Sequence, residues 1–359
     1  MKSTRHLASL GQSLWLDNLS RTLLREGGLK RLIEDDGVSG VTSNPTIFFK
    51  AISESPYYKD DFGRVKGDGS MTAEQRYEAL AIPDIQEACD LLRPVYERTG
   101  GNDGYVSLEV SPALAHDAPA TVAAGLRLKA AIGRPNLLIK VPATSAGLQA
   151  IERLIAQGCS VNVTLMFSLD HVRDVAGAYI RGLGEFVAAG GDPKAVKSVA
   201  SLFLSRVDTL VDKRLEVLGG EALTLRGRTG VALAKLAYEE YKAIFRGPLF
   251  APLAAKGARP QYLLWASTGT KNPAYSDVMY LEPLIGRETV NTVLDATLAA
   301  FRDHGQTADT LEKDVGLARE QFASLARLGV HMGKVGQQLQ QEGLKLFEQS
   351  FADLLKLMS

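Results

Sequence analysis

The sequence has few of the residues from which disulfide frameworks and metal centres are built. Only two of its 359 residues are cysteines, Cys89 and Cys159, and both lie in apolar surroundings. The five histidines are scattered, without a ligand spacing such as His-x-x-x-His. We therefore expect no disulfide framework and no metal site, and we interpret the cysteines as buried thiols in a reducing compartment.

Long apolar runs and an excess of charge are also missing. No segment approaches the ~18 apolar residues of a membrane span, and the N-terminus lacks a long apolar leader. Lysine plus arginine and aspartate plus glutamate both number 41, and the sequence pI is about 7.0. These features predict a cytoplasmic protein without a nucleic-acid or membrane partner, in which a few placed basic groups bind any anionic ligand.

Short apolar or β-branched runs recur along the chain, and most are followed by helical patterns. The runs that predict strands are residues 13–17, 38–44, 105–110, 137–141, 160–165, 198–203, 262–266 and 279–281. Alternating strands and helices favour an α/β fold with a parallel sheet, and eight such units fit a closed (β/α)₈ TIM barrel. An open doubly wound sheet is the alternative, but we find no convincing dinucleotide-binding fingerprint.

Two intervals are longer than a barrel repeat requires. Residues 72–98 show a helical pattern interrupted at Pro83, so the second connection is predicted to contain additional helices. Residues 305–359 are predicted to form a C-terminal extension of two helices, the last with an apolar stripe. We expect this stripe to dock on the barrel's own helices, with a subunit contact as the alternative. The chain reads as a single domain, 1–359, and as a monomer or homodimer.

One lysine occupies a predicted strand interior. Lys140 lies in Asn136-Leu-Leu-Ile-Lys-Val-Pro-Ala-Thr144, a run too short for a helix and too apolar for a surface loop. Loss of hydration there favours the neutral amine, which can form a Schiff base with a carbonyl substrate. The alternative is a lysine at the end of the strand whose amine reaches water.

Three predicted strands have one ionisable residue near their C-terminal ends, namely Asp17, Glu109 and Lys140. Catalytic groups of TIM barrels gather at that end. Two carboxylates and an amine that meet there can offset one another's cost of burial. The strand ends also present uncharged hydrogen-bonding groups, any one of which could instead be a turn or capping residue. These are Thr42, Asn44, Asn162, Thr164 and Ser201.

Basic groups follow two of the later strands and predict a phosphate site. Arg206 follows the sixth strand, and Lys271 follows the seventh in Ala266-Ser-Thr-Gly-Thr-Lys-Asn-Pro273. The glycine and hydroxyl groups of that segment allow close approach to an anion. The alternative for Arg206 is a salt bridge with Asp208 or Asp212.

Motifs on at least six predicted strands resemble those of the transaldolase family, over roughly residues 12–300. These motifs are Trp15-Leu-Asp17, Gly40-Val-Thr-Ser-Asn-Pro45, Ser107-Leu-Glu-Val-Ser111, Ile139-Lys-Val-Pro-Ala-Thr144, Asn162-Val-Thr-Leu-Met-Phe-Ser168 and Ser201-x-Phe203-x-x-Arg206. The segment around Lys271 and the helical tail resemble the longer bacterial branch of the family.

The resemblance implies a transferase of the non-oxidative pentose phosphate pathway. It would move a dihydroxyacetone unit from sedoheptulose 7-phosphate to glyceraldehyde 3-phosphate, giving erythrose 4-phosphate and fructose 6-phosphate. Lys140 would form a Schiff base with the C2 carbonyl, and Asp17 would take the proton of the C4 hydroxyl. Glu109 would act through a water, helped by Thr164. Since a protonated imine accepts the electrons of cleavage, we expect no cofactor.

The resemblance also implies a set of substrate contacts. Asn44 and Asn162, with Thr42 nearby, would hold the hydroxyls of the retained unit. The phosphate would be bound by Ser201, Arg206, Ser267 and Lys271. The shorter transaldolases have Ser-Phe-Arg where this chain has Ser267 followed by Thr-Gly-Thr-Lys271. Phe203 suggests a dry pocket that favours transfer. The alternatives are an aldolase that releases free dihydroxyacetone from fructose 6-phosphate and a barrel that only binds.

Overall fold

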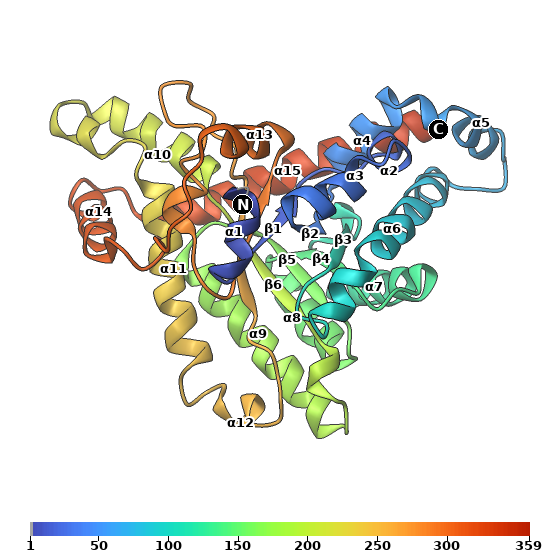
Figure 1. The fold of residues 1–359 in the computed structure, drawn as a ribbon, viewed down its shortest axis with the longest axis horizontal. Helices are drawn as coiled ribbons and strands as arrows, with labels where there is room; N and C mark the ends of the chain where they lie inside the picture. Colours follow the sequence, from blue (N-terminus) through green and yellow to red (C-terminus); the bar gives the residue numbers. More distant parts are fainter. Residues whose placement is uncertain (1–2) are drawn as a thin grey trace.

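The computed structural model describes residues 3–359, and it shows a closed barrel of parallel strands surrounded by helices (Figure 1). Each strand pairs with the next along the chain, and the last pairs with the first. The strands are β1 (Gln12–Leu16), β2 (Val38–Val41), β3 (Tyr105–Glu109), β4 (Leu137–Pro142), β5 (Val161–Met166), β6 (Ser198–Phe203), β7 (Tyr262–Ala266) and β8 (Thr289–Val293). The predicted TIM barrel is confirmed, and the open sheet is excluded.

The strands form where the sequence is apolar because both of their faces are covered. Every residue of β3, β4, β5, β6 and β8 is buried. Between β1 and β2, Trp15 lies opposite Gly40, where an added Cβ would come within 2.4 Å of the indole ring. Only glycine leaves room for the ring at this point.

The predicted eighth strand is wrong. Residues 279–281 lie in a turn after β7, and the strand that closes the barrel is Thr289–Val293. The run at 279–281 is only three residues long, and Pro283 follows it closely. The sequence Thr-Val-Asn-Thr-Val of β8 has the β-branched residues typical of a strand, but its polar positions hide the apolar signal.

Helices cover the outside of the barrel. They are α1 (Ser3–Ser9), α2 (Arg21–Arg25), α3 (Gly28–Arg31), α4 (Pro45–Glu54), α5 (Lys59–Lys66), α6 (Ala73–Arg98), α7 (Ala118–Ile132), α8 (Ser145–Ala156), α9 (Leu169–Ala188), α10 (Ser205–Leu218), α11 (Thr229–Phe245), α12 (Ala251–Ala254), α13 (Asp295–His304), α14 (Val315–Arg327) and α15 (Met332–Met358). The additional helices expected in the second connection are α4, α5 and α6. None of the helices within residues 3–359 combines the length and the apolar character that crossing a bilayer requires.

Helix α6 is continuous, so the interruption predicted at Pro83 is wrong. The helix contains both Pro83 and Pro94 in its interior. A capping box between Thr72 and Gln75 begins it, and it packs on β3 and α15. This burial outweighs the backbone hydrogen bond that each proline removes.

Helix α15 docks on the barrel as its apolar stripe predicts. It contacts α4, α6, α10 and β5, and Figure 1 shows it crossing the molecule as one long helix that ends near α4 and α5. Gln340 on this helix donates hydrogen bonds from Nε2 to the carbonyl oxygens of Ala143 (2.9 Å) and Leu165 (3.1 Å). These bonds fasten the helix to the rim of the barrel where β4 and β5 end.

Candidate active site

Lys140 and Glu109 are paired at the C-terminal ends of neighbouring strands. The register of β3 and β4 sets the two residues opposite each other, and Glu109 Oε2 lies 3.3 Å from Lys140 Nζ. The amine also donates to the carbonyl oxygen of Ser43 at 3.1 Å. Lys140 is 4% exposed, so the alternative in which its amine reaches water is wrong.

Burial and neighbouring charges act together on the two carboxylates. Burial raises the pKa of Glu109; Lys140 opposes this rise, and Asp17 adds to it. Burial likewise raises the pKa of Asp17, while Lys140, the hydrogen bond from Thr42 and Lys271 oppose the rise. A carboxylate held between desolvation and a nearby cation is suited to taking up and giving back a proton.

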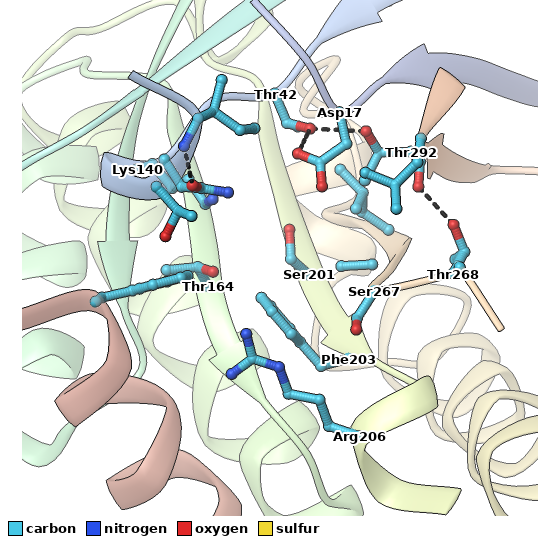
Figure 2. Close-up of a pocket in the computed structure, with 18 of the residues that line it drawn as sticks. Asp17, Thr42, Lys140, Thr164, Ser201, Phe203, Arg206, Ser267, Thr268 and Thr292 are labelled. Carbon is cyan, nitrogen blue, oxygen red and sulfur yellow. Dashed lines mark hydrogen bonds between the residues drawn. The ribbon is translucent and has the colours of Figure 1, made fainter. Parts of the chain in front are cut away.

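A cavity of about 280 Å³ opens beside this group. The predicted site residues that line it are Asp17, Thr42, Asn44, Lys140, Thr164, Ser201, Phe203, Arg206, Ser267 and Lys271. Figure 2 shows Lys140 and Asp17 at one end of the cavity and Arg206 at the other. The barrel thus brings together residues from strands that are far apart in the sequence.

Glu109 and Asn162 do not line the cavity. Glu109 contacts Lys140, which does line the cavity, and is connected to the cavity through this residue. The amide of Asn162 is buried between two serines, since its Nδ2 donates to Ser107 Oγ (3.0 Å) and its Oδ1 accepts from Ser201 Oγ (2.7 Å). Asn162 therefore fixes the orientation of Ser201, which does line the cavity.

Two other polar groups of the cavity differ in what they bind. Asn44 caps helix α4, because its Oδ1 accepts from the amide of Ile47 at 2.9 Å, and it also lines the cavity. The hydroxyl of Thr164 is buried and has no hydrogen-bond partner among residues 3–359. A buried hydroxyl without a partner costs free energy, so this group is available to a substrate or a water.

Arg206 is a half-buried cation without a carboxylate partner in the described part of the chain. Burial lowers the pKa of its guanidinium, and no charged neighbour opposes that effect. Asp208 instead accepts from the hydroxyl of Tyr280, and Asp212 accepts from the hydroxyl of Tyr275. The salt bridge considered for Arg206 is therefore wrong, and its charge faces the cavity.

The other residues considered for an anion site differ in their burial. The Arg206 guanidinium lies 5.5 Å from the ring centroid of Phe203. Ser267 has a φ of 53°, a left-handed conformation that non-glycine residues seldom adopt, and its hydroxyl lies 2.7 Å from that of Ser205. Lys271 lines the cavity but is exposed. Arg206 and the serine hydroxyls make this end of the cavity suited to an anion, while the charge of Lys271 also acts on Asp17.

Sequence reasoning missed several residues that line the cavity, among them Thr292 and Phe347. Thr292 was missed because β8 was misplaced; its hydroxyl lies 2.7 Å from that of Thr42. Phe347 was seen only as part of an apolar stripe, yet it lines the cavity with its ring centroid 5.8 Å from Lys140 Nζ. The β-branched run at 289–293 could have revealed the first, whereas no local signal marks the second.

Comparison with known proteins gives one consistent family. Residues 14–358 match the family described as Transaldolase/Fructose-6-phosphate aldolase. A transaldolase of Thiobacillus denitrificans is 57% identical over 356 residues, which cover 99% of each chain. A transaldolase of Neisseria gonorrhoeae is 47% identical over 97% of each chain. Transaldolase 1 of Streptomyces coelicolor is 47% identical over 98% of this chain and 92% of its own.

Proposed function

The chain belongs to the Transaldolase/Fructose-6-phosphate aldolase family, and its transaldolase relatives make it an enzyme of the transferase class; we propose that it transfers a dihydroxyacetone unit through a Schiff base on Lys140. The donor is sedoheptulose 7-phosphate and the acceptor glyceraldehyde 3-phosphate, so that erythrose 4-phosphate and fructose 6-phosphate are formed. The reaction belongs to the non-oxidative pentose phosphate pathway in the cytoplasm. The observation on which the proposal rests is the buried pair of Lys140 and Glu109 beside Asp17.

The reaction begins when the Lys140 ammonium group passes a proton to Glu109 and the resulting amine attacks the C2 carbonyl of the ketose. The resulting carbinolamine loses water when Glu109, through a bound water, donates a proton to the departing hydroxyl. The burial that raises the pKa of Glu109 supports its role as the acid. The hydroxyl of Thr164, which has no hydrogen-bond partner among residues 3–359, supports a role for this residue in holding that water. A protonated imine remains on Lys140.

Cleavage of the C3–C4 bond follows. Asp17 takes the proton of the C4 hydroxyl, the C4 oxygen becomes the carbonyl of the departing aldehyde, and the bonding electrons move into the imine to give an enamine. The enamine then attacks the acceptor aldehyde, and Asp17 returns the proton to the new hydroxyl. Burial raises the pKa of Asp17 and Lys140 lowers it, and this balance supports both proton uptake and proton return by Asp17.

The opposite end of the cavity binds the phosphate. Arg206 supplies a charge that has no carboxylate partner among residues 3–359, and Lys271 and Ser267 add a second cation and a hydroxyl. At the other end, Asn44 and Thr42 line the part of the cavity near Lys140, where the hydroxyls of the retained unit lie.

Transfer is favoured over release of free dihydroxyacetone. The relatives at 47–57% identity are named transaldolase. Phe203 and Phe347 line the cavity with apolar rings, which limit the water that could protonate the enamine before an acceptor arrives.

Trapping the adduct tests the proposal. The protein is incubated with fructose 6-phosphate, reduced with borohydride, and digested for peptide mass spectrometry. We expect a dihydroxyacetone-sized adduct on Lys140, none in Lys140→Met, and an unchanged adduct in the control Lys59→Met, whose lysine is exposed on α5. Folded wild-type protein without an adduct on Lys140 would overturn the proposal.

A further inference from the structure

A chain of hydroxyl groups leads from strand β8 to Asp17. Thr42 Oγ1 donates a hydrogen bond of 2.8 Å to Asp17 Oδ1, and the same Oγ1 lies 2.7 Å from Thr292 Oγ1 (Figure 2). Thr42 follows β2 directly, Thr292 lies in β8, and these two strands flank β1, which ends just before Asp17. Both threonines are 3% exposed, so their hydroxyls have little contact with bulk water.

The direction of this chain follows from counting protons. An ionised carboxylate only accepts hydrogen bonds, whereas each threonine hydroxyl has one proton to donate. Thr42 must therefore give its proton to Asp17, and its oxygen can then only accept from Thr292. The proton of Thr292 thus points to Thr42, and that of Thr42 points to Asp17.

We propose that Thr292 is a positioning residue for bond cleavage, which acts through Thr42 to hold Asp17 with Oδ2 toward the substrate. The proposal rests on the function proposed above. Oδ1 is occupied by Thr42, and Figure 2 shows the other carboxylate oxygen directed into the cavity. The proton that leaves the C4 hydroxyl therefore forms its new bond with Oδ2. The C3–C4 bond breaks as the C4 carbonyl forms, and its electrons enter the imine.

The chain also acts on the charge of Asp17. A donated hydrogen bond favours the ionised carboxylate, and a hydroxyl that itself accepts a hydrogen bond is a stronger donor. The charged groups that face Asp17 are Lys140 from β4, Lys271 after β7, Asp295 at the start of α13 and Glu109 from β3. Replacing Thr292 leaves these groups in place, so a change in the titration of Asp17 reports the hydroxyl chain.

The test is the variant Thr292→Val, which removes the hydroxyl and keeps the shape of the side chain. Borohydride trapping with fructose 6-phosphate separates a six-carbon adduct on Lys140, formed before cleavage, from a three-carbon adduct formed after it. We expect cleavage to slow about 3- to 10-fold, the range that one lost hydrogen bond predicts, while the six-carbon adduct forms at the wild-type rate. The acidic limb of the pH profile of kcat should move to higher pH. Thr292→Ser, which keeps the hydroxyl, should have the cleavage rate and the acidic limb of the wild type.

Thr289→Val is the matched control, because Thr289 lies on the same strand and its hydroxyl donates to the carbonyl oxygen of Gly286 at 2.6 Å. In Thr289→Val, the ratio of six-carbon to three-carbon adduct and the acidic limb of the kcat profile should equal those of the wild type. If circular dichroism shows that Thr292→Val is unfolded, Thr292→Ala takes its place. If the folded Thr292 variant has the adduct ratio and the acidic pH limb of the wild type, the role proposed for Thr292 is overturned. Absence of any adduct in the wild type would instead overturn the proposed function.

Discussion

Replacing Lys140 with methionine should make the free energy of unfolding depend strongly on pH. Glu109 Oε2 lies 3.3 Å from Lys140 Nζ, and their side chains are 3% and 6% exposed. Without the ammonium group, burial and Asp17 act unopposed by Lys140, and the pKa of Glu109 rises further above its ordinary value of 4.5. The folded state then binds a proton more tightly than the unfolded state, so stability is lost as the pH rises above 4.5.

The size of the loss is limited by protonation. Removing one partner of a buried ion pair costs about 3–5 kcal/mol if the other stays charged. Binding a proton instead costs about 1.4 kcal/mol for each pH unit above 4.5, or about 3.4 kcal/mol at pH 7. We therefore expect Lys140→Met to be about 3 kcal/mol less stable than the wild type at pH 7. Most of this difference should disappear near the ordinary pKa of glutamate.

Urea denaturation of the substrate-free proteins at several pH values between 5 and 8 measures this dependence. The control is the double variant Glu109→Gln with Lys140→Met, in which the pair is neutral and similar in shape. Its stability should follow the pH dependence of the wild type more closely than that of the single variant. A constant difference between Lys140→Met and the wild type from pH 5 to 8 would refute the coupling between Glu109 and Lys140.

Three further changes test the cavity and its covering helix. Arg206→Ala should lower kcat/KM for phosphorylated ketoses roughly 10- to 150-fold, the loss expected for a charge-assisted hydrogen bond, and equal losses for unphosphorylated fructose would contradict a phosphate role. Gln340→Ala should lower the free energy of unfolding by about 1–3 kcal/mol in urea, because two rim carbonyls lose their donor. Gly343→Ala should raise KM for sugar phosphates severalfold, since its Cβ would lie 2.9 Å from Leu165 and 3.3 Å from the Arg206 guanidinium. Gly316→Ala, with open space around its Cβ, should leave KM unchanged.

The sequence predicted the barrel where strands are apolar on both faces. Runs such as Leu137–Pro142 and Ser198–Phe203 are buried along their whole length, so their composition marks them clearly. Strand β8 escaped this reasoning because Asn291 and two threonines interrupt its apolar character. The two threonine hydroxyls and Asn291 Nδ2 are hydrogen-bonded, the latter to the carbonyl oxygen of Tyr280 at 2.9 Å, whereas Asn291 Oδ1 has no partner among residues 3–359. Such pairing depends on how the loop before the strand folds back onto it and on which strand lies beside it, and no local pattern encodes this arrangement.

For the site, the sequence identified residue types but not their partners. Asp17, Glu109 and Lys140 were recognisable because ionisable groups are rare in buried strands. Their contacts follow from strand register, which sets Glu109 beside Lys140 and Lys140 beside Asn162. A shift of one residue would turn every side chain to the other face. Closure of the barrel then brings β8 beside β1, a neighbourhood that no spacing along the chain predicts.

The distribution of charge along the cavity gives the substrate one orientation. Two carboxylates and Lys140 stand at one end, so one negative charge remains when all three groups are ionised. At the other end Arg206 is half-buried and has no anionic partner in residues 3–359, while Lys271, which also lines the cavity, acts on Asp17. A phosphate placed beside Asp17 and Glu109 would meet like charges in a site of low dielectric, whereas beside Arg206 it gains an opposite charge. A sugar phosphate that enters with its phosphate toward Arg206 therefore presents its uncharged carbonyl end to Lys140. An amine can form an imine only with this carbonyl end of the substrate.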